Sequence, residues 1–197
     1  MVLVDPSYPG MSGDIKRIAP ALFAMMHQGG PIVAQARVCQ AEARAGKLKP
    51  GVMDAHGCLQ RPPMFPKALR LALDRFDISH PQVFATRASR AANLEQDSAN
   101  AIDPGRNYGD MPLVVLHAGM PEPLPPAMPA AIKKAIPTLM AAGKKGQERL
   151  ARLSSRGSFR VIKDSSHYIQ VLHPGVVIAA VDKVVQEARA AEAAGSK

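Results

Sequence analysis

The segment FRVIKDSSHYIQ, residues 159–170, joins a short aliphatic run to a polar turn and a histidine. Its first four residues are typical of a strand, and the next four, Lys-Asp-Ser-Ser, mark where that strand ends. Two other aliphatic runs, MVLV (1–4) and LVVL (113–116), are unbroken, which is typical of strands covered on both faces in a parallel sheet. We therefore expect a three-stranded parallel sheet, with His167 just beyond the carboxyl end of the last strand.

Helices are expected between and after these runs. Residues 147–153 are helix-forming and separate the second run from the third. Residues 117–119, directly after the second run, are expected to form a turn because they include a glycine. After the third run, Pro174 suits the first turn of a helix. The expected apolar face of that helix comprises Val177, Val181, Val184, Val185 and Ala188. Strands that alternate with helices in this way predict a right-handed α/β arrangement.

The stretch from residue 9 to residue 110 does not fit the sheet. It is rich in Ala and Arg and is punctuated by Gly and Pro, so we expect several short helices. An insert of this length between neighbouring strands is too long for a plain loop, and a packed helical subdomain over 9–110 is expected. Residues 1–8 and 111–197 would then form the core that contains the sheet.

The composition is that of a globular protein, since 47% of the residues are hydrophobic and no low-complexity tract is present. The net charge of +9 would suit a polyanion, but Lys and Arg are spread along the chain, and the densest patch, 133–145, has no interleaved aromatic residues. No apolar run approaches the roughly 20 residues needed to span a bilayer. We therefore predict neither a nucleic-acid partner nor a membrane partner.

Cys39 and Cys58 are the chain's two cysteines and lie in a segment that is expected to be helical. In an exported protein they could form a disulfide, whereas in a reducing compartment they would be two buried thiols. The sequence leaves both alternatives, and the compartment, open. It contains neither a CxxC motif nor a Cys/His ligand spacing, so no metal site and no cofactor are predicted.

Four segments, taken in order, resemble the α/β-hydrolase superfamily. VLVDPS (2–7) resembles the strand that follows the family's nucleophile-bearing helix, and GDMPLVVLHAG (109–119) resembles the next strand. LARLSS (150–155) is similar to the helix before the last strand. VIKDSSHYIQ (161–170) resembles the strand–turn–histidine signature, and residues 174–188 resemble the closing helix. The resemblance covers about half of the chain. It implies a partial α/β-hydrolase fold, with the last three strands of the family's sheet, flanking helices, and the insert as a helical cap.

The resemblance implies that His167 is the catalytic histidine, which takes the nucleophile's proton and passes it to the leaving group. The acid that orients this histidine usually follows the strand that corresponds to residues 113–116, and the nearby carboxylate there is Glu122. Some relatives, such as certain haloalkane dehalogenases, carry the acid one strand earlier, at the position that corresponds to Asp5. We favour Asp5 and keep Glu122 as the alternative acid. Without the resemblance, His167 would be an ordinary turn histidine and Asp5 an Asx-turn residue at the end of a strand.

The nucleophile of this family lies in a G-x-S-x-G elbow, and no such motif occurs in the sequence. GMSGD (10–14) lacks the final glycine, and Ser166 is too close in sequence to His167 for in-line proton transfer. The resemblance therefore implies the C-terminal fragment of a serine-type ester or amide hydrolase. Such a fragment would be inactive alone and would bind a small-molecule substrate only in the context of the full fold.

Two other functions stay open. A truncated hydrolase fold could serve as a non-catalytic interaction protein, and the positive charge could serve a helper that binds polyanions or membrane surfaces. In the hydrolase fragment the first strand would lack its upstream neighbour, so marginal stability and self-association through the exposed sheet edge are expected.

Overall fold

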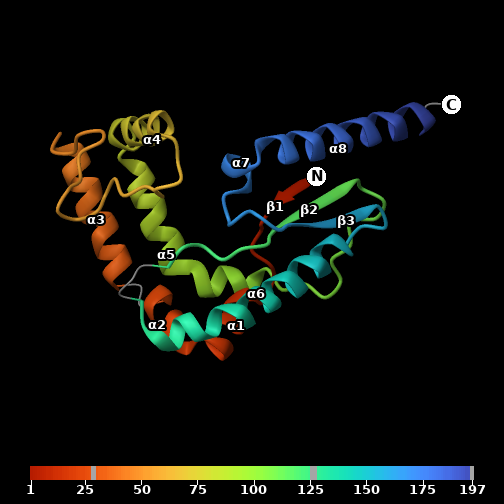
Figure 1. The fold of residues 1–197 in the computed structure, drawn as a ribbon, viewed down its shortest axis with the longest axis horizontal. Coiled ribbons are helices and arrows are strands. Elements are labelled where there is room, and N and C mark those ends of the chain that lie inside the picture. The colour runs from red at the N-terminus through yellow and green to blue at the C-terminus, as the bar shows by residue number, and fades with distance from the viewer. Residues whose placement is uncertain (28–29, 125–127, 196–197) are drawn as a thin grey trace. The chain divides into compact units, whose positions relative to one another are not determined.

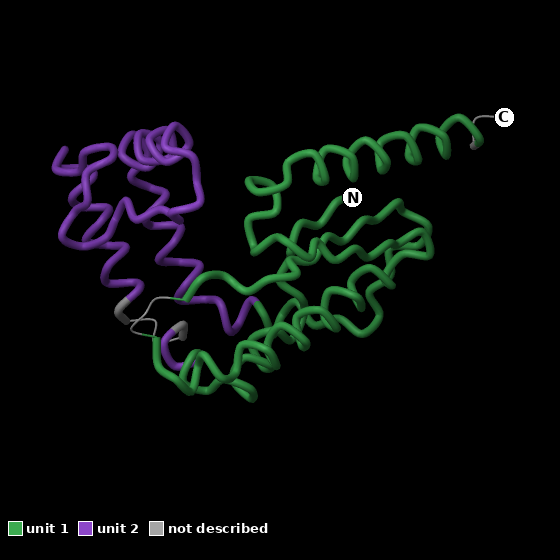
Figure 2. The backbone as a smooth tube through the Cα atoms, in the orientation of Figure 1, with its two compact units in different colours: residues 1–22, 98–197 green, residues 23–97 purple. Residues whose placement is uncertain are grey.

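A computed structural model describes residues 1–27, 30–124 and 128–195. The chain forms two compact units, coloured separately in Figure 2. Unit 1 comprises residues 1–22 and 98–197, and unit 2 comprises residues 23–97. The segment 9–110, expected to be one helical subdomain, is thus divided between the two units.

Unit 1 contains a three-stranded parallel sheet, which confirms the sheet expected from the aliphatic runs. Its strands are β1 (Val2–Val4), β2 (Leu113–Ala118) and β3 (Gly157–Ile162), in the order β1-β2-β3. Val2 lies opposite Val114, and Leu113 lies opposite Gly157. The central strand β2 is buried along its whole length. His117 and Ala118 therefore continue this strand, and the expectation that they begin a turn was wrong. The strand is longer because residues of β3 pair with it as far as Ala118.

Two helices cover the two faces of the sheet, as Figure 1 shows. α8 (Pro174–Gly195) covers one face, where its apolar residues pack against Val114, Leu116 and Ala118. α6 (Ala130–Ala151) covers the other face, where Leu150 and Ala151 pack against Leu113 and Val115. Because side chains alternate along a strand, His117 belongs to the α6 face.

α8 begins at Pro174, as expected, but its packed face differs from the expected one. Val176, Val177, Ala180 and Val184 contact the sheet cluster. Val181 and Val185 are exposed, so their assignment to the packed face was wrong. The helix is apolar over much of its circumference, and periodicity alone does not fix which stripe meets the sheet.

Two shorter helices of unit 1 pack against the helices that cover the sheet. α1 (Met11–Ile18) packs against α6, and α7 (Ile169–Leu172) precedes α8. The backbone of Gly146 in α6 lies so close to the Tyr8 ring that an added Cβ would be 2.3 Å from it. This close approach holds the segment after β1 against α6.

Unit 2 is helical, with α3 (Gly30–Arg44), α4 (Lys67–Ser79) and most of α5 (Gln82–Asn100). α2 (Pro20–His27) crosses the boundary between the two units in sequence. Cys39 and Cys58 form a disulfide with a Cα–Cα distance of 5.4 Å, so the two thiols that the sequence left open are paired in this structure. Cys39 lies in α3, but Cys58 lies outside the helices, where a helix was expected. The disulfide packs in the unit's core with Leu48, Leu59 and Phe84.

None of the helices among the described residues has both the length and the apolar character needed to cross a bilayer.

Candidate functional site

The carboxyl ends of the three strands bring Asp5, His117 and His167 together in unit 1. Asp5 directly follows β1 and has a φ of 40°, the one positive φ of a non-glycine residue within the described ranges. Its N–H donates to the carbonyl of Leu116 in β2 at 2.7 Å. Aspartate tolerates the left-handed region better than most residues, but the conformation still costs energy and persists only where the surroundings hold it. The turned backbone aims the Asp5 carboxylate across the end of β2.

Asp5 and His167, both candidates from the sequence, are in direct contact. His167 Nδ1 lies 2.8 Å from Asp5 Oδ2, although the two residues are 162 positions apart. An ionised carboxylate only accepts hydrogen bonds, so Nδ1 carries the proton and Nε2 carries the lone pair in the neutral ring. The Asp5 side chain is 15% exposed and the His167 side chain is 56% exposed. The carboxylate is therefore largely shielded from solvent, whereas the imidazole that it binds is accessible to solvent.

Glu122, the alternative acid, contacts a different part of His167. Its Oε1 accepts a hydrogen bond from the backbone N–H of His167 at 2.9 Å. A carboxylate that binds the main chain fixes the position of the residue but does not select the tautomer of its ring. The structure therefore places Asp5, and not Glu122, on the imidazole.

Gln147 and His117 complete the site, and the sequence reasoning missed both. Gln147 Nε2 donates to Asp5 Oδ1 at 3.0 Å and to the carbonyl of Pro6 at 2.9 Å. Its amide oxygen therefore faces His117 Nδ1, at 3.0 Å. Since that oxygen can only accept, His117 Nδ1 carries a proton. His117 Nδ1 also lies 3.5 Å from Asp5 Oδ1, but the amide oxygen is the nearer partner.

The two residues differ in how far the sequence could have revealed them. His117 is a polar residue at the end of an apolar strand, where α/β sheets place their sites, and this signal could have identified it. Gln147 lies in an ordinary helix-forming segment, so nothing in its neighbourhood distinguished it from a surface glutamine.

The Asp5 carboxylate is held in its ionised form. Burial raises the pKa of Asp5, but hydrogen bonds from His117, His167, Gln147 and the backbone N–H of Ala118 outweigh burial and leave this pKa well below its usual range. The Ala118 N–H donates to Oδ1 at 3.1 Å. The site thus contains a partly buried negative charge that is stabilised mainly by hydrogen bonds.

The turn that carries His167 is fixed at several points. Gly119 N–H donates to the Ile162 carbonyl at 2.9 Å, and Met120 N–H donates to the Ser165 carbonyl at 3.0 Å. A Cβ on Gly119 would lie 2.6 Å from Lys163 Cα, so only glycine allows this approach. Ser165 is fully buried. The imidazole is therefore presented by a packed turn.

Two other clusters do not form a comparable site. Ser12, in the GMSGD segment, is buried in the first turn of α1, and residues 5–10 separate that helix from the end of β1, so Ser12 does not lie in a tight turn directly after a strand. Glu42, Asp54 and Cys58 lie close together in unit 2, but Cys58 is disulfide-bonded and is no thiolate. Asp54 accepts hydrogen bonds from three backbone N–H groups, those of His56, Cys58 and Leu59. Its oxygens therefore hold the loop together, and we assign no metal to this cluster.

Comparison with protein-family models, curated proteins and solved structures gave no match to this chain.

Proposed function

We propose that this chain carries the histidine and the acid of a serine-type α/β-hydrolase site, and that polypeptide outside these 197 residues supplies the nucleophile. One observation supports the proposal above all others. The imidazole of His167 is accessible to solvent, and its Nδ1 is bound by the largely buried carboxylate of Asp5 at the carboxyl ends of parallel strands. The resemblance of the sequence to the α/β-hydrolase superfamily points to the same two residues.

In this proposal His167 is the general base. Nε2 takes the proton from the attacking serine hydroxyl as the serine oxygen bonds to the carbonyl carbon of an ester or amide. The same proton then passes from Nε2 to the leaving alcohol or amine when the bond to that group breaks. Asp5 keeps the proton on Nδ1 and stabilises the imidazolium that forms between the two steps.

Asp5 is the proposed acid because it touches the ring, and its low pKa keeps it charged when the imidazolium forms. Glu122 is proposed as a positioning residue, since it binds the backbone of His167. Gln147 is also proposed as a positioning residue, because its amide nitrogen donates to Asp5 Oδ1 and leaves Oδ2 for the imidazole. His117 is proposed to hold Gln147 in that orientation.

The test uses a longer protein in which the coding sequence upstream of Met1 is expressed together with this chain. We expect it to hydrolyse p-nitrophenyl butyrate, with kcat reduced about 10⁴-fold in Asp5→Asn and by a similar factor in His167→Ala. Glu122→Gln keeps a neutral acceptor for the His167 N–H and should lose no more than about tenfold. Full activity in His167→Ala, or a larger loss in Glu122→Gln than in Asp5→Asn, would contradict the proposed roles.

One feature favours a second candidate, a non-catalytic interaction protein. β1 pairs with β2 on one side, and no strand among the described residues pairs with its other side. An open strand edge is a template for another polypeptide. If the longer protein shows no hydrolysis but binds a peptide along this edge, the interaction function replaces the catalytic one.

A further inference from the structure

Unit 2 contains a cavity of about 540 Å³ that is separate from the site at the sheet. One wall is a face of α4 formed by Lys67, Arg70, Leu71 and Asp74, which follow the spacing of successive helical turns. The opposite wall is the loop 51–63. The volume lies within the range of about 300–1,000 Å³ that is typical of small-molecule pockets.

The loop gives this cavity an apolar lining. Leu59 is buried in the core of the unit, whereas Val52 and Met53 are 56% and 93% exposed. Together with Leu71, these side chains provide a surface for an aliphatic or aromatic group. Large apolar side chains that stay exposed beside a cavity are a common feature of a binding surface.

The acidic residues of the lining are already used inside the unit. Asp74 accepts hydrogen bonds from the Arg61 guanidinium at 2.8 Å and from the Gly51 N–H at 2.9 Å. Asp54 serves three backbone N–H groups of its own loop. Arg61 is shared between Asp74 and Asp77. The charges of Asp54, Arg61 and Asp74 are therefore already paired or hydrogen-bonded within unit 2.

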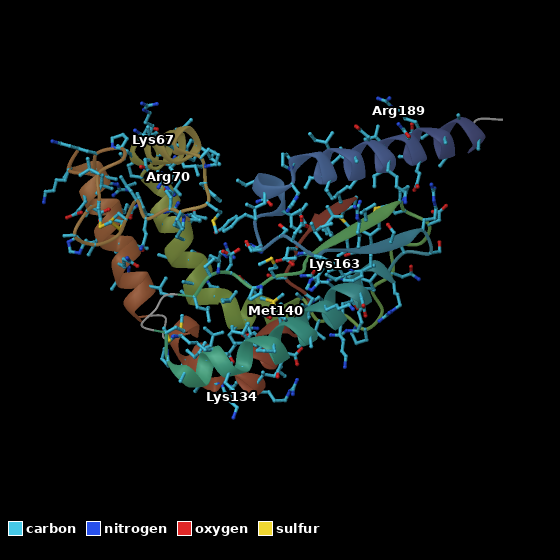
Figure 3. The ribbon with its side chains drawn as sticks, viewed as in Figure 1. Lys67, Arg70, Lys134, Met140, Lys163 and Arg189 are labelled. Carbon is cyan, nitrogen blue, oxygen red and sulfur yellow. A yellow bond between two sulfur atoms is a disulfide. The ribbon has the colours of Figure 1, made fainter. Side chains whose placement is uncertain are left out.

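Lys67 and Arg70 are the remaining charged groups of the lining. Neither forms an ion pair with a residue in the described part of the chain. Arg70 Nε is buried and donates to no described atom. Two cations that line the cavity and have no counter-ion among the described residues favour an anionic ligand. Figure 3 labels both side chains on α4.

The start of α4 adds to this positive site. Lys67 is the first residue of the helix, and Pro66 at the N-cap provides no side-chain hydrogen bond. The N–H groups of the first turn and the helix dipole favour an anion at this end. A carboxylate beside Lys67 and Arg70 would therefore meet both side-chain and backbone donors.

The walls are held in place without a ligand. The disulfide joins Cys58, next to the lining residues Gly57 and Leu59, to α3. Gly51 has a φ of 77°, a left-handed backbone conformation that favours glycine, and its N–H donates to Asp74 of α4, so the loop is tied to the helix at this point. A cavity with fixed walls spares the ligand the entropy of ordering them.

We propose that unit 2 binds an amphiphilic carboxylate, with its anionic group at Lys67 and Arg70 and its apolar part against Val52, Leu59 and Leu71. The chain would then have a ligand site that is independent of the proposed hydrolase site, because every residue of this pocket lies in unit 2.

Isothermal titration calorimetry with decanoate, below the concentration at which it forms micelles, tests this site. We expect one decanoate per chain, and at least tenfold weaker binding of 1-decanol, which has the same number of carbons but no charge. Arg70→Gln and Lys67→Gln should each weaken decanoate binding by about tenfold, because each removes one charge-assisted contact. Arg70→Lys, which keeps the charge, should lose less than Arg70→Gln.

Arg75→Gln is the matched control, since Arg75 is an exposed cation on the same helix and does not line the cavity. We expect its affinity for decanoate to stay within twofold of the parent chain, and the same for His167→Ala, which alters only the proposed hydrolase site. Thermal unfolding of each variant shows that unit 2 is folded. Equal binding of 1-decanol and decanoate, no binding at all, or unchanged affinity in folded Arg70→Gln would each overturn the proposal.

Discussion

Gln147 is 5% exposed and joins three partners in the sheet site. Its amide nitrogen donates to Asp5 Oδ1 and to the Pro6 carbonyl, and its oxygen accepts from His117 Nδ1. Gln147→Leu keeps much of the side-chain volume and removes all three hydrogen bonds. His117 Nδ1 would be left buried, with Asp5 Oδ1 at 3.5 Å as its nearest remaining acceptor. The variant therefore measures how much the network stabilises the end of the sheet.

The expected loss follows from these contacts. The bond to the charged Asp5 contributes about 1.5–3 kcal/mol, and the two neutral bonds contribute about 0.5–1.5 kcal/mol each. Burial of the added apolar surface recovers about 1–2 kcal/mol. We expect the free energy of unfolding of the Gln147→Leu variant to fall by about 2–4 kcal/mol relative to the parent chain.

Urea unfolding followed by far-UV circular dichroism measures this difference. Gln186→Leu is the control, because Gln186 is an exposed residue of α8, and its substitution should change the free energy of unfolding by no more than about 0.5 kcal/mol. Gln147→Glu adds a second carboxylate beside Asp5, and the two groups repel each other when both are ionised. The free energy of unfolding of this variant should therefore fall further below that of the parent chain at pH 8 than at pH 5. A loss below about 0.5 kcal/mol for Gln147→Leu would show that the network does not hold Asp5 in place.

Three further predictions concern stability and assembly. Because hydrogen bonds lower the pKa of Asp5, its contribution to stability is fully present above the unfolded-state pKa of about 3.9 and is lost as pH falls toward the lower folded-state pKa. Urea unfolding from pH 7 to pH 3 should show that the free energy of unfolding decreases less in Asp5→Asn than in the parent chain. An equal decrease in both proteins would contradict this. Reduction of the Cys39–Cys58 disulfide, which closes a loop with a sequence separation of 19, should cost unit 2 about 3 kcal/mol. Thermal unfolding with and without dithiothreitol measures this loss of stability, and the Cys39→Ser/Cys58→Ser double variant should reproduce it. An unfolding temperature that does not change on reduction would contradict the prediction. The chain should self-associate through the open edge of β1, seen in sedimentation equilibrium as a mass that rises with concentration, whereas a monomer at every concentration would exclude that interface.

Much of the sheet could be predicted from local sequence. Unbroken aliphatic runs indicated its three strands, and the polar residues after two of the runs marked where Asp5 and His167 stand. The packed side of α8 could not be predicted in the same way. Ile178, Val181 and Val185 are as apolar as the residues that contact the sheet, and they are exposed. Which stripe is buried depends on how the neighbouring strands and α7 place the helix.

The sequence by itself determined the candidates for the site, because strand ends and polar turns are properties of a few adjacent residues. The tertiary structure alone decided which candidate carboxylate meets the imidazole, since Asp5 and Glu122 are both within reach of His167 and bind different atoms of it. It also decided that Gln147 supports Asp5 across 142 positions and that the two cysteines are paired. Contacts of this kind arise when distant segments pack on one core, and no local pattern in the chain encodes them.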